Sequence, residues 1–527
     1  MPSYFIYLIS LYLTLHFPIA LTTSVQQQIV TFDLSPSNED NINQTLFIRQ
    51  LNLTEGNVSV NVLNVPSSIG FFVIQAHSFP QDIVLRTSVE SVKGTNIGLV
   101  EDDLTSNAVY RYEINTVLVQ NVEVLLAVVL YTKTDPIPGG CNMVYNTRNA
   151  PYQIVTYDDN MVKVDASPAK GKSCDITALP RLDMYHLYLE EQTLDNSSYF
   201  YGIENLLTVK NIKKYGTKVD SVKHLPLRRY YSAYRGTGSI FAIIATNANG
   251  SSAYIPAVSY ACDIADWGEN CLGPVSIIWK VLCAVIFFIG TFICFFGHRF
   301  FRMTMFIFGF IFGSFIFYIV ANIGNMVVLD LESVGYALLF GCAYGITWLL
   351  LWRRYGIPIL TVSLPVTFVG YITVCVIFYT GVADFRIFQN DLNYWGVVFC
   401  VILPITISLL FFTEFASILA CSVVGATAII ISIDHYIGGS IHYIILTNVR
   451  RAIISNFNLA ILNPLFQYKD IILSIAWTGL VLVGMVLQFK HQIGKPPFPP
   501  HRSLRGISNE RTPLLSGGAI RENRLNT

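Results

Sequence analysis

Residues 276–297 read SIIWKVLCAVIFFIGTFICFFG, a run that is long and apolar enough to cross a lipid bilayer as one helix. A membrane-spanning helix needs about 20 predominantly apolar residues. Six more runs of this kind follow, so the candidate spans are 276–297, 303–323, 334–352, 357–380, 394–413, 415–433 and 470–489. The sequence therefore predicts an all-α seven-helix transmembrane bundle over residues 275–490.

The overall composition agrees with a membrane protein. Of the 527 residues, 53% are hydrophobic and only 13% are charged, whereas about a quarter of the residues of a soluble protein are charged. The 34 basic and 34 acidic residues cancel, so no excess positive charge favours nucleic acid as a partner. We expect the lipid bilayer as a partner, and any other partner must be recognised by a local surface.

Residues 25–272 carry the features of β structure. Runs such as 71–74, 122–130 and 239–244 are rich in β-branched and aromatic residues, and turn formers such as those at 135–140 bound them. These patterns are typical of strands with tight connections. We predict a β-rich ectodomain of tandem β-sandwiches, over residues 25–150 and 151–272.

The N-terminal part indicates export. Residues 4–21 form an apolar run without Lys or Arg, which predicts a signal peptide at residues 1–24; an uncleaved first membrane helix is the alternative. Asn-x-Ser/Thr acceptors are glycosylated only on the lumenal or extracellular side, and every acceptor precedes residue 252. The predicted glycosylation sites are Asn43, Asn52, Asn57, Asn196 and Asn249.

Seven spans after an exported N-terminus place the tail, residues 491–527, in the cytosol. Eleven Lys and Arg residues then lie in cytosolic loops and tail against four in outer loops, as the positive-inside rule requires. The fifth and sixth spans are joined by a turn with Glu414 and no basic residue, so a re-entrant hairpin is the alternative there. The outer segment 434–469 has mixed apolar and charged character, and an amphipathic helix lying on the outer membrane face is expected.

Four of the ten cysteines fall in the exported part, where an oxidising compartment permits disulfides. Three connectivities are possible, and we predict Cys141 with Cys174 and Cys262 with Cys271 because each pair closes a local loop. The six cysteines of the apolar segments are interpreted as small packing residues.

Catalysis and ion-coupled transport both need polar groups that converge inside the membrane. Lys280, Glu414 and Asp434 lie at span ends, where we expect them to reach water. Asp434, His435 and His442 could meet on one face of an outer helix, and a surface group is the preferred interpretation. We therefore predict no catalytic residues, no metal and no cofactor.

The number of spans matches receptors that couple to G proteins, but the motifs do not. The third span ends with LWRRY at 351–355 in place of an acidic-Arg-aromatic triplet, and the last span lacks an Asn-Pro-x-x-Tyr run. An atypical receptor stays open as an alternative.

The tail contains ERTPLL at 510–515, which fits the acidic dileucine pattern. In an extended tail the two leucines can enter an apolar pocket of a clathrin adaptor complex. We predict a sorting motif made of Glu510, Leu514 and Leu515, and a location in the plasma membrane and the endosomal and lysosomal system.

Several runs, in order along the chain, resemble the transmembrane 7 superfamily member 3 family. They are DPIPGGCN at 135–142, AYIPA at 253–257, YAC at 260–262, FICFFGHRF at 292–300, RYGI at 354–357, PPH at 499–501 and ERTPLL at 510–515. The resemblance implies a glycosylated multi-pass protein whose vertebrate members act as pro-survival factors: they attenuate stress of the endoplasmic reticulum and the unfolded protein response, and they promote insulin secretion. It implies no enzymatic residues. The chain departs from the family in its shorter tail and in Glu414, which stands where a basic inner loop is expected.

These observations predict a non-enzymatic membrane glycoprotein that acts by scaffolding or signalling and binds an unidentified lumenal or extracellular ligand. The alternatives are an atypical orphan seven-span receptor and a transporter of lipid or a small neutral solute. A cavity between the helices would favour the transporter.

Overall fold

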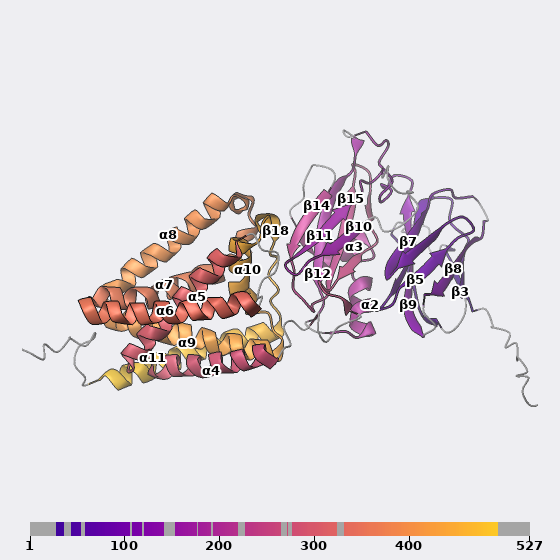
Figure 1. Cartoon of the computed structure of the whole chain (residues 1–527). Helices are drawn as coiled ribbons and strands as arrows, with labels where there is room; N and C mark the ends of the chain where they lie inside the picture. Colours follow the sequence, from indigo (N-terminus) through magenta and orange to yellow (C-terminus); the bar gives the residue numbers. More distant parts are fainter. Residues whose placement is uncertain are drawn as a thin grey trace, which may run out of the picture.

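The computed structural model contains two β-sandwiches followed by a bundle of helices (Figure 1). It describes residues 28–35, 44–53, 58–105, 108–117, 121–141, 153–175, 178–190, 193–219, 227–264, 271, 277–323 and 331–493. The predicted signal peptide, the acceptors Asn43 and Asn57, and the dileucine motif lie outside these residues.

The first sandwich is built from two sheets. Its strands are β1 (Ile29–Asp33), β2 (Leu46–Leu53), β3 (Val58–Leu63), β4 (Ile69–Ser78), β5 (Ile83–Arg86), β6 (Ser91–Gly94), β7 (Asn96–Glu101), β8 (Tyr110–Thr116) and β9 (Val122–Thr132). One sheet has the order β1-β3-β8-β5-β6 and the other has the order β2-β9-β4-β7. In β3 every second residue is buried, beginning with Val58, as expected of a strand with one face in the core.

The second sandwich also has two sheets. Its strands are β10 (Gln153–Tyr157), β11 (Met161–Ala166), β12 (Arg181–Tyr188), β13 (Thr217–Val219), β14 (Leu227–Ser232), β15 (Ser239–Thr246), β16 (Ser251–Ala253), β17 (Ala257–Ser259) and β18 (Ala460–Ile461). Two short helices, α2 (Asn196–Glu204) and α3 (Val209–Tyr215), stand between β12 and β13. The sheet orders are β10-β11-β14-β18 and β13-β12-β15-β16, with β17 also paired to β15. One strand, β18, therefore comes from the predicted transmembrane domain.

The sheet β2-β9-β4-β7 is buried on both faces. Phe72 and Ile74 of β4 pack in the core of the first sandwich, whereas Phe71 and Val73 pack in a core shared with the second sandwich. A strand that is buried on both faces needs apolar residues throughout, which explains the unbroken apolar run at 124–131 within β9. The two sandwiches are thus held to each other by a common core.

The C-terminal half contains seven helices that are long and apolar enough to cross a membrane. They are α4 (Ile277–Phe296), α5 (Phe301–Asn322), α6 (Leu331–Tyr355), α7 (Pro358–Tyr379), α8 (Asp391–Leu410), α9 (Thr413–Ile437) and α11 (Tyr468–Gln492). An eighth helix, α10 (Tyr443–Ile453), is shorter. The predicted fold class, a β-rich part with tandem sandwiches plus a seven-helix bundle, is confirmed, and α8 and α9 are each long and apolar enough to cross a membrane.

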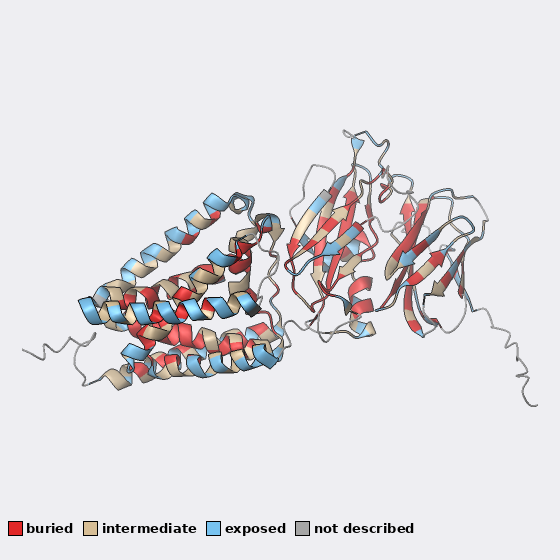
Figure 2. Cartoon of the chain, viewed as in Figure 1, coloured by how far each residue is buried: buried red, intermediate tan, exposed pale blue. Residues whose placement is uncertain are grey.

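The helix α9 lies at the centre of the bundle, in contact with α4, α7, α8 and α11. It is the most deeply buried of the seven spans, whereas α6 and α8 are largely exposed on the outside (Figure 2). Small residues permit this position: a Cβ on Gly425 would lie 2.7 Å from the Cα of Cys294 in α4. Gly309 of α5 and Gly345 of α6 also pack closely, as small residues at helix interfaces allow.

Candidate functional site

The loop between α9 and α11 leaves the bundle and joins the second sandwich (Figure 1). Its strand β18 extends a sheet of that sandwich in parallel with β14, pairing Ala460 with Tyr230 and Ile461 with Tyr231. We call the contact between residues 438–467 and the second sandwich the junction. The sandwich side of the bundle is the end where the junction lies.

The junction contains α10, which is amphipathic as expected but is placed differently. No residue of α10 is exposed. Val449 and Ile453 pack with Phe457 of the loop, and Tyr443 packs with Tyr234 of the second sandwich. The expectation that this segment lies on the outer membrane face is therefore wrong. The sandwich covers the face of α10 that would otherwise meet water.

Arg450 of α10 connects the two parts directly. Its guanidinium is buried and donates to the carbonyl oxygens of Ala233 at 2.8 Å and Asp159 at 3.2 Å, and to the hydroxyl of Ser232 at 3.3 Å. It also lies 5.2 Å from the ring centre of Tyr443. Burial lowers the pKa of the Arg450 guanidinium below its usual value. Because hydrogen bonds from charged groups are strong and a buried charge without them is costly, Arg450 holds the sandwich against α10.

A second set of contacts joins residues 462–467 to the sandwich. The hydroxyls of Tyr188 and Tyr234 donate to the carbonyl oxygens of Asn463 and Leu462, at 2.7 and 2.8 Å. The amide nitrogen of Asn463 lies 2.7 Å from Nδ1 of His186. Since an amide nitrogen can only donate, this ring nitrogen of His186 accepts, and the ring is neutral.

The same loop is tied to the bundle by carboxylates. Asp384, just after α7, accepts from the backbone amides of Leu462 at 2.6 Å and Asn463 at 3.0 Å. Burial raises the pKa of the Asp384 carboxyl, and the two amide hydrogen bonds oppose this rise. Residues 462 and 463 thus contact the bundle and the sandwich at once.

Asp434 and Asp470, at the ends of α9 and α11, hold the start of the loop. Asp470 accepts from the backbone amide of Ser440 at 2.9 Å and from its hydroxyl at 2.6 Å. Asp434 accepts from the amide of His442 at 3.0 Å and lies 2.7 Å from its Nδ1. Both carboxylates are fully buried, so the expectation that Asp434 reaches water is wrong. Burial is possible because backbone and side-chain donors satisfy the carboxylate.

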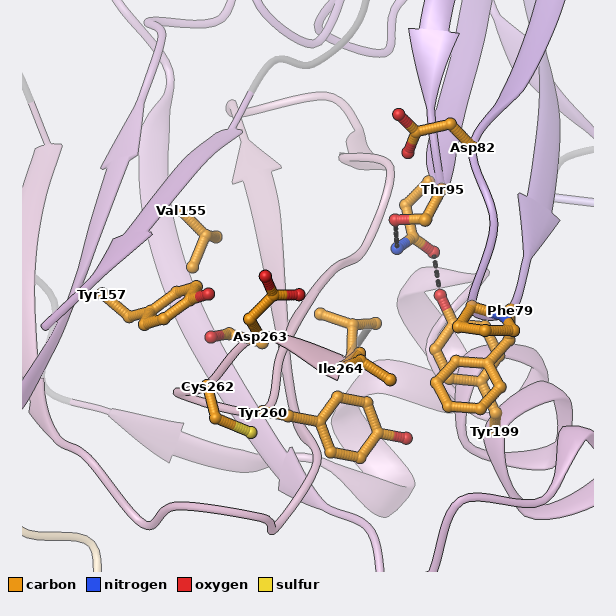
Figure 3. Close-up of a pocket in the computed structure, with 14 residues that line it drawn as sticks. Phe79, Asp82, Thr95, Val155, Tyr157, Tyr199, Tyr260, Cys262, Asp263 and Ile264 are labelled. Carbon is orange, nitrogen blue, oxygen red and sulfur yellow. Dashed lines mark hydrogen bonds between the residues drawn. The ribbon is translucent and has the colours of Figure 1, made fainter. Parts of the chain in front are cut away.

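A polar pocket of about 400 Å³ lies between the two sandwiches (Figure 3). Asn96 of the first sandwich accepts from the hydroxyl of Tyr199 of the second at 2.9 Å. The carboxylates of Asp82 and Asp263 and the ring of Tyr157 also line it. Such a pocket can hold a small polar group or a peptide side chain.

The described residues contain no group of three or more His, Cys, Asp or Glu side chains that could hold a metal ion. The structure pairs Cys141 with Cys174 and Cys262 with Cys271, the two pairs predicted from local loop closure. Cys262 also lines the pocket between the sandwiches.

Three of the predicted glycosylation sites are described. Asn52 is exposed on β2, and Asn249 is exposed in the turn before β16. Asn196 is half-buried at the start of α2, and its amide donates to Glu123 at 2.9 Å. The glycans themselves stay a prediction.

The candidate functional residues that sequence reasoning missed are those of the junction. Arg450 counted only as one outer basic residue, and no sequence pattern singled out His186 or paired it with Asn463. The one available signal is the mixed apolar and charged character of residues 434–469. It indicates an amphipathic helix but not the partner that covers it.

The fold and the junction define a multi-pass membrane protein in which tandem β-sandwiches are docked on a seven-helix bundle. Three family models match it in order: the TM7SF3-like N-terminal immunoglobulin-like domain at 39–131, the TM7SF3-like second immunoglobulin-like domain at 136–265, and the TM7S3/TM198-like domain at 283–489. The chain belongs to the transmembrane 7 superfamily member 3 family.

Relatives in mammals match over most of their length. Transmembrane 7 superfamily member 3 of Mus musculus is 28% identical over 460 residues, which cover 83% of this chain and 81% of the relative. The Homo sapiens protein of the same name is 27% identical over 460 residues, covering 83% and 80%. A Bacillus licheniformis lipase structure matches at 11% identity over 44% of each chain. Its TM-score of 0.13 is too low to indicate a shared fold.

Proposed function

We propose that the protein is a non-enzymatic membrane glycoprotein that acts by scaffolding or signalling, and that its junction makes the sandwiches and the bundle respond together. The observation that carries this proposal is the buried Arg450, whose hydrogen bonds cross from α10 to the second sandwich. A ligand bound by the sandwiches can affect the bundle only if the two parts are physically connected. The junction supplies such a connection.

The cellular role in this proposal follows the family. The protein attenuates stress of the endoplasmic reticulum and the unfolded protein response, promotes cell survival and, in endocrine cells, promotes insulin secretion. Membership of the family supports this role. It requires sandwiches on the lumenal or extracellular side and a cytosolic tail, in which Glu510, Leu514 and Leu515 bind clathrin adaptor complexes for endosomal and lysosomal sorting.

Arg450→Gln tests the junction, with Arg451→Gln as the matched control. The neighbouring Arg451 donates to Asp391 at 2.7 Å and to the carbonyl oxygen of Phe388 at 2.6 Å, both within the bundle. Hydrogen bonds to a charged group contribute about 1.5 to 3 kcal/mol each. We therefore expect Arg450→Gln to increase amide exchange in β14 and β18 at least about tenfold, whereas Arg451→Gln leaves these strands protected.

The same variants test the role in cells that lack the endogenous protein. After thapsigargin treatment, we expect the wild type and Arg451→Gln to lower the induction of lumenal chaperones, and Arg450→Gln to have lost this effect at equal abundance. If Arg450→Gln exposes the strands yet still lowers chaperone induction, the junction does not carry the function. Unchanged amide exchange in Arg450→Gln would instead show that Arg450 does not hold the two parts together.

A receptor for a small polar ligand is the second candidate. The pocket between the sandwiches favours it, because its polar side chains and volume of about 400 Å³ suit such a ligand. Ligand-dependent nucleotide exchange on a G protein, reconstituted with the purified chain, would favour this candidate over the first.

A further inference from the structure

A cavity of about 510 Å³ lies between the helices on the sandwich side of the bundle. Thr427, Ile430 and Ile431 of α9 form its floor, and α7 and α11, which both pack against α9, form its two walls. Residues of α10 line the end nearest the sandwiches, together with Pro464 and Phe466. We call this cavity the α9 groove.

The wall of the α9 groove is apolar, and most of its polar side chains already donate within the protein. The side chains of Ile, Val, Phe and Trp dominate it. The internal donations run from Tyr379 to the Leu465 carbonyl at 2.9 Å, from Trp477 to the Thr427 hydroxyl at 3.0 Å, from Thr478 to the Ser474 carbonyl at 3.0 Å and from Thr380 to the Ile377 carbonyl at 2.7 Å. Water has few partners in such a space, and apolar cavities of this kind bind apolar molecules.

The α9 groove is open to the lipid-facing surface of the bundle. Val376 and Phe466, both in its lining, have exposed fractions of 43% and 53%. Around a membrane-spanning bundle the surrounding medium at this surface is hydrocarbon. The volume of the groove falls within the range of about 300 to 1,000 Å³ that is usual for small-molecule sites.

We propose that the α9 groove binds one acyl chain of a phospholipid from the leaflet on the sandwich side. An acyl chain needs no hydrogen-bond partner, whereas a sterol brings a hydroxyl that must find one, and four of the wall's polar side chains are already engaged. The exposed ring of Phe466 lines the groove, and Tyr468, two residues later, is also exposed. Aromatic side chains of this kind suit the headgroup level. This site does not depend on the function proposed for the junction.

Photolabelling of the purified full-length chain in detergent tests the proposal. The probe is a phosphatidylcholine with a diazirine on its acyl chain, and the adducts are mapped by mass spectrometry. We expect labelling that saturates at one lipid per chain, with adducts on residues of α7, α9, α10 and α11 that line the groove. A sterol with the same photoreactive group is expected to label these residues at least fivefold less.

Two variants fill the groove, and a neighbouring variant serves as the control. Ser474→Phe and Thr478→Phe place a ring in the wall formed by α11, whereas Ile475→Phe changes a side chain that is 69% exposed on the same helix. We expect labelling to fall at least fivefold in both filling variants and to persist in Ile475→Phe, with similar thermal unfolding midpoints. Labelling that does not saturate, that persists in either filling variant, or that favours the sterol would overturn the proposal.

Discussion

His186 shows how one side chain at the junction responds to pH. Its ring is buried between Tyr188 and Phe241, and burial lowers its pKa from 6.5 to about 3. Burial also lowers the pKa of His77, in the first sandwich, to about 4. Between these values and 6.5 the unfolded chain binds more protons than the folded chain, so stability falls as the pH falls below about 6.5.

Acidification from pH 7.4 to pH 5 is therefore expected to destabilise the sandwiches by roughly 2 kcal/mol for each of the two histidines. In His186→Gln the side chain cannot take up a proton, so we expect this variant to lose about 2 kcal/mol less than the wild type on acidification. Thermal unfolding of the purified chain at the two pH values measures the difference. An equal loss in both proteins would contradict the neutral, acceptor role of His186.

At the scale of elements, close packing of α9 depends on the absence of side chains at particular positions. A Cβ on Gly425 would meet the backbone of Cys294 in α4, and backbone atoms cannot move aside as a flexible side chain can. We expect Gly425→Ala to destabilise the bundle by about 1 to 3 kcal/mol, the usual cost of overpacking.

Gly479→Ala is the matched control for Gly425→Ala, because a Cβ at Gly479 of α11 meets nothing within 4 Å. Alanine is a better helix former than glycine, so this variant should be neutral or slightly stabilising. Thermal unfolding midpoints in lipid nanodiscs compare the two variants. Equal midpoints would mean that the contact between α4 and α9 is looser than the structure indicates.

The elements differ in how far their sequence determines them. The seven spans were predictable, because each carries its own hydropathy signal over about 20 residues. The run at 122–130 predicted a strand because its residues are mainly β-branched and apolar, although it did not indicate that both faces are buried. The strand β18 has only two residues, and its pairing depends on Tyr230 and Tyr231 far earlier in the chain. No local pattern could have predicted that contact.

The junction residues also differ in how far the sequence predicted them. The amphipathic character of the outer segment predicted a helix, and α10 is present. The expected location of α10 was wrong, because an amphipathic helix can cover its apolar face with a membrane or with another part of the protein. Asp434 was expected to reach water because span ends usually do, but donors from the following turn satisfy its carboxylate inside the protein.

At the scale of the whole molecule, two buried contacts join the first sandwich, the second sandwich and the helix bundle. The sheet β2-β9-β4-β7 is shared between the cores of the two sandwiches, and the junction joins the second sandwich to the bundle. A single connecting strand would leave the sandwiches free to swing. Hydrogen bonds from Arg450, Tyr188 and Tyr234 act at separate points, so we expect the chain to move as one body.

The most direct test is a distance distribution between the second sandwich and the bundle. Spin labels on non-natural amino acids at Tyr201 of α2 and Leu392 of α8, both exposed positions, avoid the free cysteines. Double electron–electron resonance in nanodiscs should give a single narrow distribution for the otherwise wild-type chain and a broadened one after Arg450→Gln. A broad or multiple distribution before that substitution would contradict a docked sandwich.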